Sequence, residues 1–251
     1  MEYPKVTHLY KYYPVKVHSL FVLINKKVWF SKPATLNDPF DIDIDFKHSM
    51  SLKDFRCMIK VLRSKNRISN EKFEEIKQNT PDQNSLDEMS EAMNKKFRDD
   101  RKNWGLFCMC ESPKNILMWS HYADFHRGFC IQFVRSPEND LGKIEKTRPV
   151  SYSHEYPTAD PYTENGMKKI YDELFFTKAK GWKYEKEWRM LNEKGDIEVP
   201  WPGRISAIIF GVNMPGPKRK AIKNILSDNQ EIKYQQAVKV KNKFRLEIIE
   251  G

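Results

Sequence analysis

Apolar and polar positions change their period several times along the chain, and each period predicts a type of element. Short alternating or apolar runs predict strands at residues 7–13, 27–33, 105–110, 128–134, 148–153, 204–212 and 231–249. Apolar positions at helical spacing predict helices at residues 15–25, 112–125, 164–180 and 216–228. Because strands and helices alternate irregularly, the pattern favours an α+β domain with a mixed β-sheet over a doubly wound nucleotide fold.

Residues 51–103 have a different pattern from the rest of the chain. The spacing S-x-x-D at Ser51 and S-x-x-E at Ser85 is that of a capping box, and predicts two helix starts. Apolar positions at helical spacing follow both, and a less regular helix is predicted around Phe73. We therefore expect one domain over residues 1–251, with a helical insertion at residues 51–103.

The composition is that of a folded protein with an excess of positive charge. Hydrophobic residues make up 39% of the 251 residues and aromatic residues 13%, which is more aromatic content than a disordered chain carries. The net charge of +10 favours an anionic partner such as a nucleotide or nucleic acid. No apolar run approaches the roughly 20 residues of a membrane span, and no secretion signal opens the chain, so we expect a cytoplasmic protein without membrane contact.

The four cysteines fit a reducing compartment. Cys57 falls in a helical pattern, and Cys108, Cys110 and Cys130 fall in strand-like apolar runs, which favours reduced core residues. The C-x-C pair has no second pair to complete a zinc site, and alternate strand residues point to opposite faces. No bound metal is expected.

Polar residues gather in four clusters, each of which also has a purely structural explanation. In LYKYYP, Lys11 lies between Tyr10 and Tyr12 on a predicted strand. A cation beside aromatic rings can hold a phosphate while a base or nicotinamide stacks, although aromatic residues in strands usually serve packing.

The second cluster is the stretch TLNDPFD. An Asn-Asp-Pro sequence favours a turn because Asx side chains bond nearby backbone groups and proline fixes the next dihedral angle. The following Phe and Asp are more specific than a surface turn requires. The candidate residues of this stretch are Asn37, Asp38, Phe40 and Asp41.

The third cluster is MWSHYADFHRG, in which a helix with an N-cap at Ser112 and Pro113 in its first turn is predicted to lead towards a strand. Two histidines, a serine and an arginine within eight residues make a binding or catalytic site as plausible as a structural role. The candidates are Ser120, His121, Tyr122, His126 and Arg127. Trp119 is expected to pack in the core.

The fourth cluster is WKYEKEWRM at residues 182–190. If it is a strand, alternation places Glu185, Glu187 and Arg189 on one face and the aromatic residues on the other. If it is a helix, Glu185 and Arg189 form only an i,i+4 pair worth about 0.3–0.5 kcal/mol. The aromatic surroundings and the preceding Gly181 favour a loop that leads into a strand.

An ordered set of motifs resembles the bacterial domain-of-unknown-function family DUF2971. The motifs are LYKYY, LNDPFD, NILMWSHYADFHRGFCIQF, TKAKGWKYEKEWRM and IIFG. Together they extend over nearly the whole chain outside the helical insertion. The resemblance implies no established reaction, but it suggests a role in antiphage or toxin-like defence.

The order of elements more distantly resembles the ADP-ribosyltransferase superfamily, in which a split mixed sheet holds NAD. This resemblance implies that Glu187 stabilises the oxocarbenium-like state as nicotinamide leaves and that Glu185 places the acceptor. From the third cluster, His121 is added as a candidate catalytic residue. Lys11 would take the place of the usual arginine or histidine on the first strand, with Tyr10 or Tyr12 stacking. NAD would then be the substrate, with ADP-ribose transferred to a protein or nucleic acid, or NAD hydrolysed outright.

Two other classes of function stay open at this point. A metal-dependent nuclease or phosphodiesterase would bring Asp38, Asp41, His121, His126 and Glu187 to one divalent cation. A non-enzymatic module would instead bind nucleic acid through basic residues near the C-terminus, such as Lys239, Lys241, Lys243 and Arg245. The enzyme ranks first because the polar side chains are concentrated in clusters.

Overall fold

The computed structural model describes residues 1–46, 49–163 and 165–251, and these divide into two compact units. Unit 1 comprises Met1–Thr35, Trp104–Val150 and Lys180–Gly251, and unit 2 comprises Leu36–Asn103 and Ser151–Ala179. Each unit is described by itself. Both contain helices and strands, and the sheets pair both parallel and antiparallel strands, so the predicted α+β class with a mixed sheet is confirmed.

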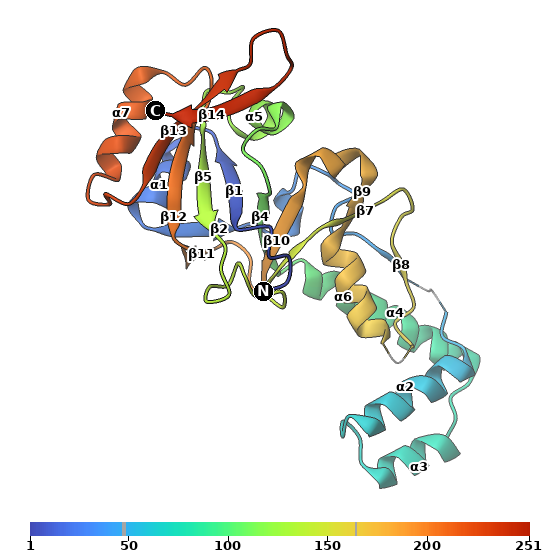
Figure 1. Cartoon of the computed structure of the whole chain (residues 1–251). Helices are drawn as coiled ribbons and strands as arrows, with labels where there is room; N and C mark the ends of the chain where they lie inside the picture. The colour runs from blue at the N-terminus through green and yellow to red at the C-terminus, as the bar shows by residue number, and fades with distance from the viewer. Residues whose placement is uncertain (47–48, 164) are drawn as a thin grey trace. The chain divides into compact units, whose positions relative to one another are not determined.

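Unit 1 is built on an eight-stranded sheet of order β14-β13-β12-β5-β1-β4-β10-β6 (Figure 1). Its strands are β1 (His8–Tyr13), β4 (Gly105–Cys110), β5 (Phe129–Val134), β6 (Thr147–Pro149), β10 (Glu187–Asn192), β12 (Ile205–Phe210), β13 (Lys233–Lys239) and β14 (Leu246–Glu250). Neighbouring strands are antiparallel except β12 and β13. β1 and β4 pair at one position, Tyr10 with Cys110, whereas β1 and β5 pair at six. The sheet is therefore narrowly joined at its centre.

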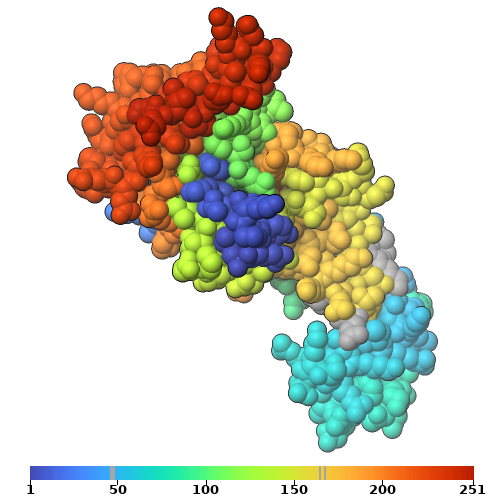
Figure 2. Space-filling view, viewed as in Figure 1, coloured from blue at the N-terminus to red at the C-terminus, as the bar shows by residue number. Residues whose placement is uncertain are grey.

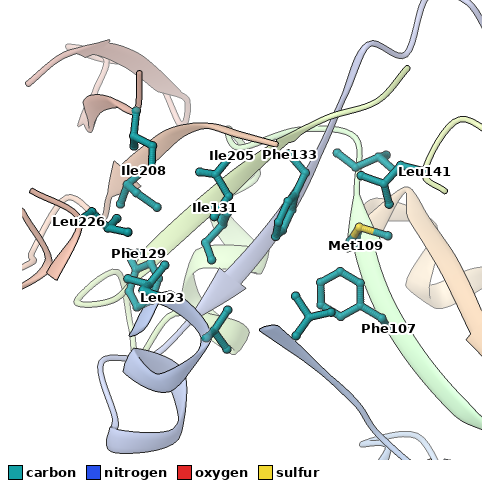
Figure 3. Close-up of a cluster of buried hydrophobic side chains, with 14 of the residues drawn as sticks. Leu23, Phe107, Met109, Phe129, Ile131, Phe133, Leu141, Ile205, Ile208 and Leu226 are labelled. Atoms are coloured by element: carbon teal, nitrogen blue, oxygen red, sulfur yellow. The ribbon is translucent and has the colours of Figure 1, made fainter. Parts of the chain in front are cut away.

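Helices cover both faces of this sheet. On one face α1 (Val17–Ile24) and α7 (Gly216–Ile225) bury Leu23 and Ile222 in the larger core. Figure 3 shows this core, in which residues of β4, β5 and β12 interdigitate. On the other face α5 (Ile116–Tyr122) buries Met118 and Trp119 against Leu246 and the central strands, so the packing role predicted for Trp119 is confirmed. A two-stranded sheet of β2 (Lys27–Phe30) and β11 (Ile197–Pro200) completes unit 1, with the short 3₁₀ helix η1 (Pro33–Thr35).

Unit 2 contains the helical stretch predicted from the capping boxes. Its helices are α2 (Leu52–Ser64), α3 (Asn70–Gln78), α4 (Gln83–Arg101) and α6 (Gly166–Phe176), with β3 (Asp45–Phe46), β7 (Ser151–Ser153), β8 (Thr158–Ala159) and β9 (Thr177–Ala179). Phe55, Phe73 and Leu86 from three different helices meet in its core. The first helix has the predicted capping box at Ser51. No helix in the described ranges is both long and apolar enough to cross a membrane.

Two predicted helix starts are wrong, because in each case a different side chain caps the helix N-terminus. α4 begins one turn before Ser85, since Asp82 accepts the Ser85 N–H at 2.8 Å and its charge suits the positive helix end. α5 begins after the predicted Ser112, since Asn115 accepts the N–H groups of Leu117 and Met118.

Two further predicted elements are interrupted. The strand expected at residues 148–153 is divided into β6 and β7 at Val150. The helix expected at residues 164–180 ends at Phe176. The chain continues as strand β9, because the β-branched Thr177 adopts extended backbone there. The first residue predicted for this helix, Glu164, lies outside the described residues.

Candidate functional site

The stretch WKYEKEWRM is a 3₁₀ helix followed by a strand, so the strand alternation predicted for Glu185 is wrong. The 3₁₀ helix η2 runs over Lys180–Glu185, Lys186 takes a positive φ of 46°, and β10 begins at Glu187. A left-handed residue ends the alternation that the sequence pattern assumed. Trp182 and Tyr184 are accordingly half-buried outside the strand, and Glu185 is placed by the turn.

Within β10 the predicted alternation is confirmed. Glu187 pairs with Cys110 and Arg189 with Cys108, so these residues share one face of the sheet, while Trp188 lies in the larger core on the other face. Two guanidinium nitrogens of Arg189 donate to Glu187, Nε to Oε1 at 2.7 Å and Nη2 to Oε2 at 3.1 Å. Arg189 is fully buried and Glu187 is 5% exposed. This bidentate pair fixes the orientation of the carboxylate.

Glu185 is the second buried carboxylate of the site, at 4% exposure. The hydroxyl of Tyr122, the last residue of α5, donates to its Oε1 at 2.6 Å. The same helix is tied to η2 at its other end, because the Asn115 amide donates to the Tyr184 carbonyl at 2.6 Å. Two hydrogen bonds thus hold α5 against the segment that carries both glutamates.

Two thiols of β4 lie on the Glu187 face. Removal from water and the Glu187 charge raise the pKa of Cys108 to about 12, and Cys108 also hydrogen-bonds that carboxylate. Burial raises the pKa of Cys110 to about 12, with a smaller contribution from the Glu185 charge. Both thiols are therefore protonated at neutral pH, which suits packing and hydrogen bonding more than nucleophilic attack.

Lys11 does not join the two glutamates. Tyr10 pairs with Cys110, which pairs with Glu187, so Tyr10 shares the face of Glu187 and the next residue, Lys11, lies on the opposite face. There its ammonium group lies 5.3 Å from the centre of the Phe107 ring. Tyr12 shares the Tyr10 face, but it is buried in a cluster with Trp119, and its hydroxyl donates to the Ser112 carbonyl. The predicted stacking residue on the glutamate face is therefore Tyr10.

The MWSHYADFHRG motif is distributed over α5 and the turn that follows it. His121 is exposed, with its ring centre 6.4 Å from that of Tyr184. Ser120 and His126 contact each other at 3.2 Å between Oγ and Nε2, and burial lowers the His126 pKa. Arg127 forms an exposed ion pair with Asp124 at 2.9 Å. The motif therefore separates into His121 and Tyr122 beside η2, and the contact of Ser120 on α5 with His126 in the following turn.

The turn after α5 has an uncommon backbone. Asp124, Phe125 and His126 have φ values of 48°, 52° and 66°. Three successive non-glycine residues in the left-handed region cost conformational energy, and such strain is concentrated at functional sites in known proteins. Gly128 ends the turn, where its N–H donates to the Ala123 carbonyl at 2.8 Å.

The NDPFD turn forms a separate cluster in unit 2. Asp38 accepts the Phe40 N–H at 2.9 Å, which is the expected Asx geometry. Asp41 accepts the Ile42 N–H at 3.0 Å and pairs with Lys178 of β9 at 3.6 Å. Both aspartates are 8% exposed. The turn explanation is therefore supported for Asp38, and Asp41 additionally forms a buried ion pair.

The other two candidates of this turn are exposed. Asn37 lies at the surface, and Phe40 is 68% exposed. An exposed phenylalanine between two buried aspartates is not explained by packing within the unit. Among the described residues, no group of three or more His, Cys, Asp or Glu side chains is placed to hold a metal ion.

Three residues that belong to these clusters were not predicted from the sequence. They are Asn115, Cys108 in its contact with Glu187, and Lys178. The sequence around Lys178 indicates its pairing. Lys178 is the charged residue within an otherwise apolar helix-to-strand junction, and a lysine is almost never fully buried unless it is paired. Asn115 follows from its own cap preference, which competes with that of Ser112.

Comparisons with known proteins bear on the middle of the chain. No curated protein and no solved structure matches the chain. A family model described as "Protein of unknown function (DUF2971)" matches residues 118–190. The match includes α5 from Met118 onward, the left-handed turn, η2 and the Glu187 end of β10, and it excludes the LYKYY, LNDPFD and IIFG motifs. The predicted resemblance to the DUF2971 family is therefore confirmed over residues 118–190.

Proposed function

We propose that the protein is an NAD-consuming enzyme resembling ADP-ribosyltransferases, with Glu187 as the residue that stabilises the cation formed when nicotinamide leaves. The observation that carries the proposal is the pair of buried carboxylates, Glu185 at the end of η2 and Glu187 at the start of β10. Loss of nicotinamide puts positive charge on the ribose. A carboxylate held in place beforehand and shielded from water stabilises such a charge more than one that must first reorient.

The contacts of the two carboxylates support different roles. The Glu187 carboxylate is oriented by two nitrogens of Arg189, which keeps it from rotating as the ribose charge develops. The Tyr122 hydroxyl donates a hydrogen bond to the Glu185 carboxylate and so ties its orientation to α5. A carboxylate oriented in this way can place an acceptor. We assign Glu187 to stabilisation of the ribose cation and Glu185, with Tyr122, to placement of the acceptor. His121 borders this group through its proximity to Tyr184.

The position of Lys11 changes the predicted binding of NAD. Since Lys11 lies on the opposite face of the sheet, it does not take the role of the superfamily's first-strand cation, and Tyr10 is the early-strand residue available for stacking. The acceptor would be a protein or nucleic acid. A cytoplasmic place of action in bacterial defence or as a toxin is the biological setting that the family resemblance suggests, and it belongs to the same proposal.

The proposal is tested by incubating the full chain with NAD, where water takes the ADP-ribosyl group in place of a macromolecular acceptor, and measuring released nicotinamide and ADP-ribose by chromatography. We expect turnover by the wild type and a loss of at least about 100-fold in Glu187→Gln, the scale seen when a preorganised electrostatic contact is removed. Glu198→Gln is the matched control, since Glu198 is also on a strand of unit 1 but its side chain is 41% exposed. Equal turnover by Glu187→Gln and Glu198→Gln, at equal folded fraction, would exclude the role assigned to Glu187.

A further inference from the structure

A concave site lies in unit 1 beside α5. It is a pocket of about 280 Å³ between the first residue of α5, the turn after it, and the hairpin of β13 and β14. Its apolar wall includes Ile116 and Leu246, and its polar wall includes His126, Lys239 and Lys243. This volume is just under the range of typical ligand pockets, ~300–1,000 Å³, so it fits one nucleotide-sized unit better than a dinucleotide such as NAD.

The charge of the pocket wall is positive. Three cations line it: Lys239, Lys243 and Arg245. Arg245 forms an ion pair with Glu247 at 2.6 Å. Lys239 and Lys243 are exposed residues of the hairpin. A concave surface with several cations and one acidic neighbour attracts anions, and phosphate groups are the anions that lysine and arginine commonly bind.

His126 adds a neutral polar group to this wall. Its Nε2 contacts Ser120 Oγ at 3.2 Å, whereas its Nδ1 is buried and has no hydrogen-bond partner within the described part of the chain. The strained φ of 66° at His126 holds the ring in this place.

Phe244 is the most exposed large apolar residue of the hairpin, with a relative exposure of 101%. It also lines the pocket, between Lys243 and Arg245. Figure 2 shows the C-terminal hairpin, in red, projecting from the surface. An aromatic ring held in water between two cations has no packing role within the unit. The same combination is the usual stacking platform of proteins that bind single-stranded nucleic acid.

We propose that this pocket and hairpin bind single-stranded nucleic acid, with one base stacking on Phe244 and the adjoining phosphates lying on Lys239, Lys243 and Arg245. The concavity favours this partner over a flat anionic surface, because one nucleotide enters the pocket while the chain continues along the hairpin. A paired duplex does not present an unstacked base to the ring. The binding is independent of NAD consumption.

The test is the fluorescence anisotropy of labelled single-stranded DNA and RNA of the same mixed sequence, titrated with the full chain. We expect saturable binding of at least one strand type, weakened at least about fivefold in Phe244→Ala through loss of stacking. In the double variant Lys239→Ala/Lys243→Ala, the slope of log affinity against log salt should fall in magnitude by about 1.4, since each phosphate contact contributes about 0.7.

The controls separate this site from general positive charge. Lys220→Ala/Lys233→Ala removes the same charge from exposed positions that do not line the pocket, and it should leave the affinity within about twofold. Equal loss in both double variants, equal binding of the matching duplex, or binding of anionic phospholipid vesicles but not of oligonucleotides would overturn the proposal. None of these outcomes depends on NAD turnover, so the two proposals fail separately.

Discussion

Glu187→Ala is expected to lower the free energy of unfolding by about 3–5 kcal/mol, because it leaves a guanidinium group buried without its carboxylate. Arg189 is fully buried, and the two nitrogens that now bond Glu187 would lose their partner. The desolvation cost of the arginine then remains without the attraction that offsets it. Urea unfolding followed by tryptophan fluorescence measures this difference.

The double variant Glu187→Leu/Arg189→Met shows whether the pair is needed for the fold itself. Since both charges leave together, we expect most of the lost stability to return. Glu198→Ala is the control for a surface ion pair, that of Glu198 with Lys27 at 3.6 Å, and it should cost less than about 1 kcal/mol. A loss of less than about 1 kcal/mol in Glu187→Ala would contradict the buried pair.

Gly128→Ala is expected to destabilise unit 1 by more than about 2 kcal/mol, because its backbone neighbours leave no space for a methyl group. A Cβ atom at this position would lie 2.1 Å from the Tyr13 carbonyl oxygen and 2.9 Å from the Ala123 carbonyl oxygen. Both are backbone atoms, so relief requires β1 or the left-handed turn to move. Thermal unfolding followed by circular dichroism measures the effect.

Gly216→Ala is the matched control for this substitution. A Cβ atom there would meet nothing within 4 Å, and Gly216 is the first residue of α7, where alanine favours the helix. We expect its melting temperature to stay the same or rise. Equal melting temperatures for Gly128→Ala and Gly216→Ala would contradict the close approach of β1 to the turn.

The strands and helices of the core were predictable because one periodic signal decides each of them. The apolar runs of β4, β5 and β12 are too long and too apolar for surface segments, and the alternation of Glu187, Trp188 and Arg189 correctly separated two faces. The N-cap residue of a helix was predictable only where the sequence offered a single candidate. Ser51 had no competitor, whereas Ser85 was displaced by an aspartate one turn earlier.

The assembly of the site was less predictable, since it depends on strand register and on single residues with unusual backbone. Alternation alone does not say which face of β1 matches which face of β10, and the observed register places Lys11 away from Glu187. The left-handed Lys186 moved Glu185 out of the strand, where Tyr122 of α5 now reaches it. The pairing of Asp41 with Lys178 joins residues distant in the chain, for which a single sequence carries no signal.

Glu187 therefore affects both the stability of the fold and the proposed activity, and the two effects can be measured separately. Its pairing with Arg189 makes it important for stability, and its place beside Glu185 makes it the proposed catalytic carboxylate. Glu187→Gln keeps the shape of the side chain and an acceptor for Arg189, so it removes the negative charge with less disturbance than Glu187→Ala. Activity compared at equal folded fraction then reports on the charge alone.

The most direct test of the central claim is a calorimetric titration of the wild-type chain with NAD, before any acceptor is known. A protein that consumes NAD must first bind it, so we predict saturable heat of binding and a melting temperature that rises with NAD concentration. Absence of both, in a sample whose unfolding transition shows it to be folded, would contradict the assignment of Glu185 and Glu187 to an NAD site.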